Sequence, residues 1–152
     1  MNISLSFALT MNAITDADVE PVVALWQRCG LTRPWNDPHS DIALARRRDN
    51  STILIGRDDS AIVATAMVGH DGHRGWVYYV AVDPECRKRG YGRIIMAAVE
   101  DWLRQAGIAK LQLLVRRENA QANAFYQSLG FEESTSVMFQ KWLDGRDTTS
   151  NN

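Results

Sequence analysis

The chain has 152 residues and is 45% hydrophobic, which is the size and composition of one ordinary domain with a single buried core. Its 17 basic and 18 acidic side chains nearly cancel, so no overall field would hold the chain on nucleic acid or on an anionic membrane. Cys29 and Cys86 lie far apart without CxxC spacing, which argues against a disulfide framework and a thiolate metal site. No apolar run reaches transmembrane length and the N-terminus has no cationic leader, so we expect a cytoplasmic protein.

The first third of the sequence predicts one strand and two helices. Residues Ser4 to Leu9 alternate polar and apolar side chains, as a half-buried strand does. Helical spacing follows from Thr15, a suitable N-cap, to Gly30, which can end a helix. A loop with two prolines, residues 31–38, separates this helix from a weaker and more polar helical pattern over residues 39–49.

The middle of the sequence predicts the body of a sheet. Two β-rich runs, residues 51–57 and 61–70, are separated by the turn-forming DDS, which favours an antiparallel pair. The run GWVYYVAV, residues 75–82, is apolar on both faces and therefore belongs in the middle of the sheet. A helix then begins after Gly90 and ends at Gly107.

The last part of the sequence predicts alternating strands and a helix. LQLLVR, residues 111–116, is typical of a buried strand, and residues 119–130 form a short helix that Gly130 ends. Residues 131–143 predict one or two final strands, and the polar residues 144–152 predict a disordered tail. We therefore expect one domain over residues 1–143, with a mixed α/β layer architecture.

The stretch VDPECRKRGYGRII, residues 82–95, places four cations around two glycines ahead of an apolar helical pattern. The cations are Arg87, Lys88, Arg89 and Arg93, and the glycines are Gly90 and Gly92. A helix that begins just after Gly90 leaves its first amide N–H groups unpaired, and its dipole adds partial positive charge there. Such an end binds phosphate. The GxxxxGK of a P-loop and the third glycine of a dinucleotide motif are absent, so a phosphate site and a solvated cationic turn remain as alternatives.

A second segment, ENAQANAFYQSLGF at residues 118–131, extends this pattern. Together with RKRGYG after the strand YYVAVDPE, it resembles the GNAT superfamily of acetyl-coenzyme A dependent N-acetyltransferases. The first run matches the family's R/Q-x-x-G-x-G/A pyrophosphate loop at Arg87, Gly90 and Gly92. The second run matches its NxxAxxFYxxxGF helix at Asn119, Ala122, Phe125, Tyr126, Gly130 and Phe131. The resemblance implies the GNAT acyltransferase fold, a mixed and mostly antiparallel sheet that is splayed between two strands and flanked by helices.

The same resemblance implies a site for acetyl-coenzyme A, as acetyl donor, without a metal. The strand ending VAV should carry a bulge near Ala81, so that backbone groups of Val80 to Val82 pair with the pantetheine arm. An N–H at about Val82 would stabilise the oxyanion of the thioester. The N–H groups from Arg87 to Gly92, that of Tyr91 included, would hold the pyrophosphate, with Arg93 beside them.

The NxxAxxFYxxxGF helix implies further cofactor and catalytic residues. Asn119 looks like the family's asparagine that hydrogen-bonds the cofactor, and Phe125 of the same motif is a further cofactor-binding candidate. Tyr126, near the start of the short helix, looks like the tyrosine that protonates the departing thiolate. A phenol suits this work because it stays protonated near neutral pH. The alternative for Tyr126 is an aromatic side chain buried beside Phe125.

The general base is left open by the sequence. Related ribosomal-protein N-terminal acetyltransferases carry a glutamate where this chain has Leu114, so that role does not transfer. His70, Asp71 and His73 are expected in the turn before the central strand, which also carries Tyr78 and Tyr79. A polar hairpin explains the turn better than a metal site, which would lack a fourth ligand.

LTRPWNDP, residues 31–38, falls where members of this superfamily build the acceptor pocket. Together with GHDGHRG, residues 69–75, it resembles a little-characterised bacterial subgroup of GNAT proteins. Trp35 could wall an apolar or cationic part of the substrate, Asp37 could bind an ammonium group and Arg33 could pair with a carboxylate. Asp71 and Tyr78 are further substrate candidates. Alternatively the loop is structural, with its tryptophan in the core and its aspartate capping the second helix.

These observations predict an N-acetyltransferase that moves the acetyl group of acetyl-coenzyme A directly to a primary amine of a small molecule. Two alternatives are a protein N-terminal acetyltransferase of the ribosomal-protein type and a non-catalytic acetyl-coenzyme A binding module. We expect no nucleic-acid partner and no membrane partner, because the basic clusters are separated and the net charge is near zero. A homodimer is left open.

Overall fold

The structure is a computed structural model that describes residues 8–147. The chain divides into two compact units, Met1–Leu114 and Val115–Asn152. The first unit holds the sheet and three of the helices, and the second unit holds one helix followed by irregular chain. Within residues 8–147, no helix has both the length and the apolar character that a membrane span requires.

A five-stranded mixed sheet forms the centre of the first unit, with its strands in the order β1-β2-β3-β4-β5. β1 to β4 pair antiparallel with their neighbours, whereas β5 joins β4 in parallel. The mixed sheet confirms the predicted α/β class, whereas GWVYYVAV, predicted in the middle of the sheet, has strands on both sides only at Gly75 and Trp76. The strands are β1 Thr10–Ala13, β2 Ser51–Asp58, β3 Ala61–His70, β4 Gly75–Val82 and β5 Leu111–Gln112.

One predicted strand boundary is wrong, and another prediction lies largely outside the described residues. The first strand lies at Thr10–Ala13, where it pairs with β2, and most of the predicted range Ser4–Leu9 falls outside the described residues. The predicted strand over residues 111–116 shortens to Leu111–Gln112. This shortening has a physical cause, because a strand extends only as far as a neighbouring strand completes its hydrogen bonds, whatever its apolar pattern.

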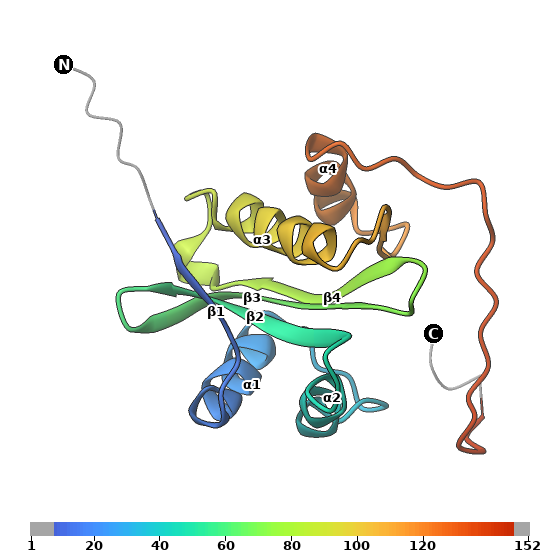
Figure 1. Ribbon diagram of the computed structural model, residues 1–152, viewed down its shortest axis with the longest axis horizontal. Helices are drawn as coiled ribbons and strands as arrows, with labels where there is room; N and C mark the ends of the chain where they lie inside the picture. Colours follow the sequence, from blue (N-terminus) through green and yellow to red (C-terminus); the bar gives the residue numbers. More distant parts are fainter. Residues whose placement is uncertain (1–7, 148–152) are drawn as a thin grey trace. The chain divides into compact units, whose positions relative to one another are not determined.

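Helices cover both faces of the sheet (Figure 1). α1, Val19–Arg28, and α2, Pro38–Ala45, lie on one face, and α3, Tyr91–Gln105, lies on the other. The predicted start of the first helix is confirmed, because a short 3-10 turn over Asp16–Asp18 leads into α1 and Asp18 accepts hydrogen bonds from the backbone and hydroxyl of Thr15 at 2.9 and 3.0 Å.

Glycines and exposed polar residues lie at the ends of the helices. Gly30, Gly90 and Gly107 all have positive φ, at 67°, 80° and 77°, which confirms their predicted places at helix ends. The second helix ends at Ala45, earlier than the predicted residue 49. The arginines after it, residues 46–48, are exposed and gain nothing from helical packing against the sheet.

The core on the α1 and α2 face is built from aliphatic side chains around Trp26. Trp26, Val22 and Leu25 of α1 are fully buried against Ile53 and Ile55 of β2. On the other face, α3 contributes a buried row at helical spacing, consisting of Ile95, Met96, Val99 and Leu103. Each fully buried side chain of this size contributes about 1.5–3 kcal/mol, so the two helical faces hold the sheet in a fixed place.

β4 carries a bulge that changes which of its side chains face α1 and α2. Met67 of β3 pairs with Tyr78 and Thr65 pairs with Ala81, so Tyr79 and Val80 together oppose a single residue of β3. Tyr79 has a φ of 51°, in the left-handed region that side chains rarely adopt. The predicted bulge near Ala81 is therefore present, centred slightly earlier in the strand.

β4 and β5 stay paired over a short distance only. Gly75 pairs with Leu111 and Trp76 with Gln112, and no further residue pair joins the two strands in the described part of the chain. β3 therefore remains the one described strand that pairs with β4 from Val77 to Val82. The sheet is splayed at this edge, as the resemblance implied.

The second unit contains α4, Ala120–Ser128, which is capped by Asn119 and followed by Gly130 with a φ of 91°. The predicted helix is confirmed. The predicted final strands over residues 131–143 are wrong, because the structure has no strand in this stretch. Residues 144–147 are also irregular, and the rest of the predicted tail lies outside the described residues.

Candidate functional site

The start of α3 has the geometry of an anion-binding helix end. Arg87 is extended, Lys88 has a φ of 65°, and Gly90 has a φ of 80° and is the N-cap. Arg87, Lys88, Arg89 and Arg93 are all exposed. The first turn of α3 contains no acidic residue, so the positive end of the helix dipole lies beside these cations.

The loop before α3 is held in place by the β2–β3 hairpin. The hydroxyl of Tyr91 donates to Asp58 at 2.9 Å, and a guanidinium nitrogen of Arg89 lies 3.9 Å from the same carboxylate. Tyr91 is only 1% exposed, so its side chain belongs to the core and only its backbone N–H could reach a ligand. This anchoring presents the loop as a preformed site.

The backbone of Val80 to Val82 has one edge with no strand partner in the described chain. On the other edge, Ala81 and Val82 pair with Thr65 and Ala64 of β3. The side chain of Ala81 is buried in the core, so this segment can offer backbone groups, but not that side chain, to a ligand. An extended molecule could add to the free edge as a further strand does.

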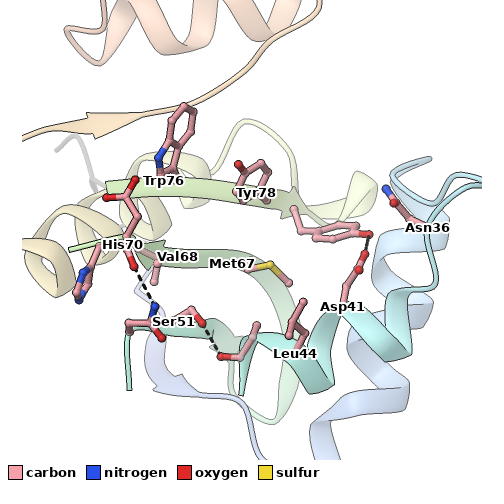
Figure 2. A pocket seen from close by; sticks show the side chains of 14 residues that line it. Asn36, Asp41, Leu44, Ser51, Met67, Val68, His70, Trp76 and Tyr78 are labelled. Atoms are coloured by element: carbon pink, nitrogen blue, oxygen red, sulfur yellow. Dashed lines mark hydrogen bonds between the residues drawn. The ribbon is translucent and has the colours of Figure 1, made fainter. Parts of the chain in front are cut away.

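A cavity of about 460 Å³ lies between α2 and strands β3 and β4 (Figure 2). Asp41 and Asn36 lie at one end of it, His70 and Trp76 lie at the other, and Tyr78 lies between them. The described lining includes two aspartates and no lysine or arginine. The lining residues are Asn36, Asp41, Leu44, Ala45, Asn50, Ser51, Met67, Val68, Gly69, His70, Asp71, Trp76, Tyr78 and Tyr79.

Tyr79 joins the cavity to the core. Its hydroxyl donates to Asp41 at 2.7 Å, and its ring stacks on Trp26 with centroids 3.8 Å apart and planes 7° apart. Burial and the hydrogen bond to Asp41 raise the pKa of Tyr79 far above its ordinary value, so this phenol stays protonated. Burial also raises the pKa of Tyr78, the next residue along the cavity wall.

Two of the five predicted substrate residues line the cavity, Asp71 and Tyr78. The other three, Arg33, Trp35 and Asp37, are not among the residues that line it. Arg33 donates to the backbone oxygens of Gly30 and Thr32, which closes the loop on itself.

Asp37 caps α2, which is the structural alternative to the predicted substrate-binding role. Its side chain accepts hydrogen bonds from the His39 N–H and the Ser40 hydroxyl, both at 3.0 Å, at the start of α2. The Ser40 hydroxyl and the backbone N–H groups of Ser40 and His39 lower the pKa of Asp37. Trp35 is half-buried and does not belong to the buried core.

The histidines and the aspartate of the β3–β4 turn form the predicted polar hairpin. Asp71 accepts from the N–H groups of Arg74 at 2.7 Å and His73 at 2.9 Å, and these bonds lower its pKa. The Nδ1 atom of His70 accepts from the N–H of Gly72 at 3.1 Å. Among the described residues, no group of three or more His, Cys, Asp or Glu side chains could hold a metal ion.

Within the second unit, Asn119 uses its side-chain oxygen to cap α4, accepting from the Ala122 N–H at 3.1 Å. Tyr126 lies in the last turn of α4, so the predicted place near the start of the helix is wrong. Its ring meets Phe125 and Phe131 edge to face, at centroid distances of 5.1 and 5.7 Å. Burial raises the pKa of Tyr126, which keeps its hydroxyl protonated at neutral pH.

The sequence did not reveal that Asp41, Asn36 and Trp76 line the cavity. It placed Tyr79 on β4 but did not predict its hydrogen bond to Asp41. Asp41 sits in the first turn of a short polar helix, where a carboxylate is ordinary, so no local signal marks it. The signal that did exist was the adjacent pair Tyr78 and Tyr79. Two neighbouring aromatics can share one face of a strand only where a bulge breaks the alternation.

The comparisons with known proteins agree with this architecture. The model of the acetyltransferase (GNAT) family matches residues 11–131, which extend over both compact units. An acetyltransferase of Yersinia enterocolitica is 36% identical over 135 residues, covering 89% of this chain and 96% of the relative. An acetyltransferase of Yersinia pseudotuberculosis is 37% identical over 126 residues, covering 83% and 89% of the two chains.

Solved structures have the same fold. A putative acetyltransferase from Agrobacterium tumefaciens matches with a TM-score of 0.74 and 21% identity, covering 88% of this chain and 99% of that one. AAC(6')-Iy, in complex with the bisubstrate analogue CoA-S-monomethyl-acetylneamine, matches with a TM-score of 0.76 and 20% identity over 88% and 97% of the chains.

A ribosomal-protein alanine N-acetyltransferase from Escherichia coli has a TM-score of 0.72 and 26% identity, over 91% of this chain and 87% of that one. The splayed mixed sheet, the glycine turn before α3 and these matches agree on one assignment. The chain is an acyltransferase and belongs to the GNAT family of acetyltransferases.

Proposed function

We propose that the chain transfers the acetyl group of acetyl-coenzyme A directly to a primary amine of a small molecule that binds in the cavity. The observation that carries this proposal is the continuity of β4. Its residues Trp76, Tyr78 and Tyr79 line the cavity, and the strand then runs directly into the unpaired edge of Val80 to Val82. An amine in the cavity would therefore lie beside the strand that holds the thioester.

The reaction needs the chain to supply binding, polarisation and proton transfer. The amine nitrogen attacks the thioester carbonyl carbon, a C–N bond forms, and the C–S bond then breaks. The N–H at about Val82 stabilises the oxygen of the tetrahedral intermediate. The exposed cations and backbone N–H groups from Arg87 to Arg93 hold the pyrophosphate.

Protons leave the attacking nitrogen, and one proton reaches the departing sulfur. The ammonium must lose one proton before it attacks, because an amine is mostly protonated near pH 7, and the nitrogen loses a second proton as the amide forms. Tyr126, whose raised pKa keeps it protonated, gives a proton to the departing coenzyme A thiolate. Asn119 and Phe125 of the same motif contact the cofactor, and residues 1–143 act as one catalytic domain.

The lining of the cavity favours a cationic acceptor. Among the described residues that line it, Asp41 and Asp71 are acidic, and there is no lysine or arginine. The aromatic faces of Trp76, Tyr78 and Tyr79 suit an ammonium or its apolar stem. The two aspartates take the ammonium-binding role that the sequence had assigned to Asp37.

A protein N-terminus is the second candidate acceptor, favoured by the likeness to the Escherichia coli ribosomal-protein alanine N-acetyltransferase. Leu114, which stands where those enzymes carry a glutamate, argues against it. The test is release of coenzyme A thiol with monoamines, diamines, amino acids and peptides that begin with alanine. Turnover of small amines supports the proposal. Turnover of peptides alone would assign the second candidate, and tight cofactor binding without any turnover would indicate a binding module.

A cavity variant connects the activity to this site. Leu44 lines the cavity and is 62% exposed, so Leu44→Trp should narrow the cavity without disturbing the core. We expect it to raise the KM for the amine and leave the KM for acetyl-coenzyme A unchanged. Ala43→Trp is the matched control, since Ala43 is exposed on the same helix and does not line the cavity. Equal amine KM values for the two variants would place the acceptor elsewhere.

A further inference from the structure

Tyr79 has a strained backbone inside a strand. Its φ of 51° falls in a region that is unfavourable for a bulky residue. Such strain costs on the order of 1–3 kcal/mol and persists only where surrounding contacts over-determine the conformation. The contacts that hold Tyr79 are therefore informative about what the bulge does.

Three contacts hold Tyr79, and a buried threonine links two of them. The Thr65 hydroxyl donates to the Tyr79 carbonyl oxygen at 3.1 Å and accepts from the Trp26 Nε1–H at 2.8 Å. The Tyr79 ring stacks on the same Trp26, and its hydroxyl donates to Asp41. Thr65 and Trp26 are both 0% exposed, so water cannot replace these bonds.

Contacts from α1 and β3 also hold the chain after the bulge. The Cys29 thiol at the end of α1 donates to the Val82 carbonyl oxygen at 3.3 Å. Arg28 forms an ion pair with Asp83 at 3.0 Å, and the Asp83 N–H donates to the Val63 oxygen at 2.8 Å. Residues 79–83 are thus held by α1 and β3, and the opposite edge of this segment has no strand partner in the described chain.

We propose that Thr65 and the Tyr79–Asp41 pair are positioning residues for acetyl transfer. They hold the bulge in the one conformation that presents the backbone of Val80 to Val82 to the cofactor. This inference rests on the proposed function, because it needs that segment to bind acetyl-coenzyme A. It also places Asp41 in two roles, since the carboxylate that holds Tyr79 lines the acceptor cavity.

The first test compares Thr65→Val with Thr65→Ser. Valine keeps the volume but removes both the bond to the Tyr79 oxygen and the acceptor of the Trp26 Nε1–H, whereas serine keeps the hydroxyl and both bonds. We expect Thr65→Val to weaken acetyl-coenzyme A binding about 3- to 10-fold by calorimetry on folded protein, the range for losing the one of these two bonds that holds the bulge. Thr65→Ser should restore affinity to near the wild-type value.

A matched control separates positioning from general loss of stability. Thr52→Val makes the same change on β2, at a half-buried threonine that does not line the cavity. It should leave cofactor affinity unchanged. If folded Thr65→Val binds the cofactor as tightly as wild type and differs only in its melting temperature, the network supports the fold alone and the proposal is overturned.

Tyr79→Phe tests the other half of the network, and serves if Thr65→Val fails to fold. It keeps the stack on Trp26 and removes only the bond to Asp41. We expect kcat/KM for acetyl-coenzyme A to fall about 3- to 10-fold, and an unchanged value would overturn the role of the pair. A wild-type protein that binds no acetyl-coenzyme A would instead refute the proposed function. Normal wild-type binding with unaffected variants would refute only this inference.

Discussion

Gly90 offers a direct test of the phosphate site, because there is room at this position for two side chains that have the same shape and differ in charge. It is the N-cap of α3 with a φ of 80°, and a Cβ at this position would meet no atom within 4 Å. Asparagine and aspartate have nearly the same shape, tolerate the left-handed region better than other side chains, and are both good N-caps. Gly90→Asn and Gly90→Asp should therefore fold alike, each losing about 1 kcal/mol from the left-handed backbone.

The two variants should differ sharply in binding acetyl-coenzyme A. A carboxylate about 5 Å from a phosphate charge is repelled by roughly 3 kcal/mol at an effective dielectric constant of about 20. That repulsion lowers affinity about 100-fold. We expect calorimetry to show weak or undetectable binding to Gly90→Asp and much closer to wild-type binding to Gly90→Asn. Equal affinities for the two variants would show that no phosphate lies near the start of α3.

Three further outcomes test catalysis and stability. Tyr126→Phe should bind acetyl-coenzyme A normally and slow single-turnover acetyl transfer about 10²–10⁴-fold, and an unchanged rate would remove Tyr126 from the mechanism. Burial opposes ionisation of Asp18, but hydrogen bonds, one of them from Arg57, outweigh burial and lower the pKa of Asp18. The ionised Asp18 therefore stabilises the folded state above its unfolded pKa near 4, and this stabilisation is lost as pH falls through the lower folded pKa. Acid unfolding of Asp18→Asn should accordingly depend less on pH between about 5 and 2 than that of wild type, and parallel curves would contradict the assignment. A Cβ on Gly75 would lie 2.5 Å from Leu103 Cδ1, so Gly75→Ala should lower the free energy of unfolding by about 1–3 kcal/mol, and combining it with Leu103→Ala should give less than the sum of the two single losses in denaturant titrations.

Local features of this chain could be predicted because neighbouring residues in the sequence determine them. Gly30, Gly90, Gly107 and Gly130 each end or begin a helix in a left-handed conformation that only glycine adopts at little cost. The capping box at Thr15 and the cationic loop before α3 depend on contacts within a few residues. The family resemblance also rests on two such local motifs.

The acceptor cavity could not be predicted in the same way. The sequence pointed to Trp35 and Asp37, but Asp37 caps its own helix and neither residue lines the cavity. Asp41 and Tyr79 meet although they are 38 positions apart, and no short-range pattern records that contact.

The ends of the strands could not be predicted from the sequence either, for a related reason. Residues 131–143 and 113–116 have apolar patterns suited to strands, yet the structure assigns no strand to them. A strand depends on a partner that completes its hydrogen bonds, so its limits are decided between segments. The sequence by itself determined the helices, their caps and the cationic glycine-containing loop before α3, because the interactions that form them act within one or two helical turns. Only the tertiary structure decided the bulge at Tyr79, the cavity and the splayed edge of β4, because each arises where distant segments are packed against one another.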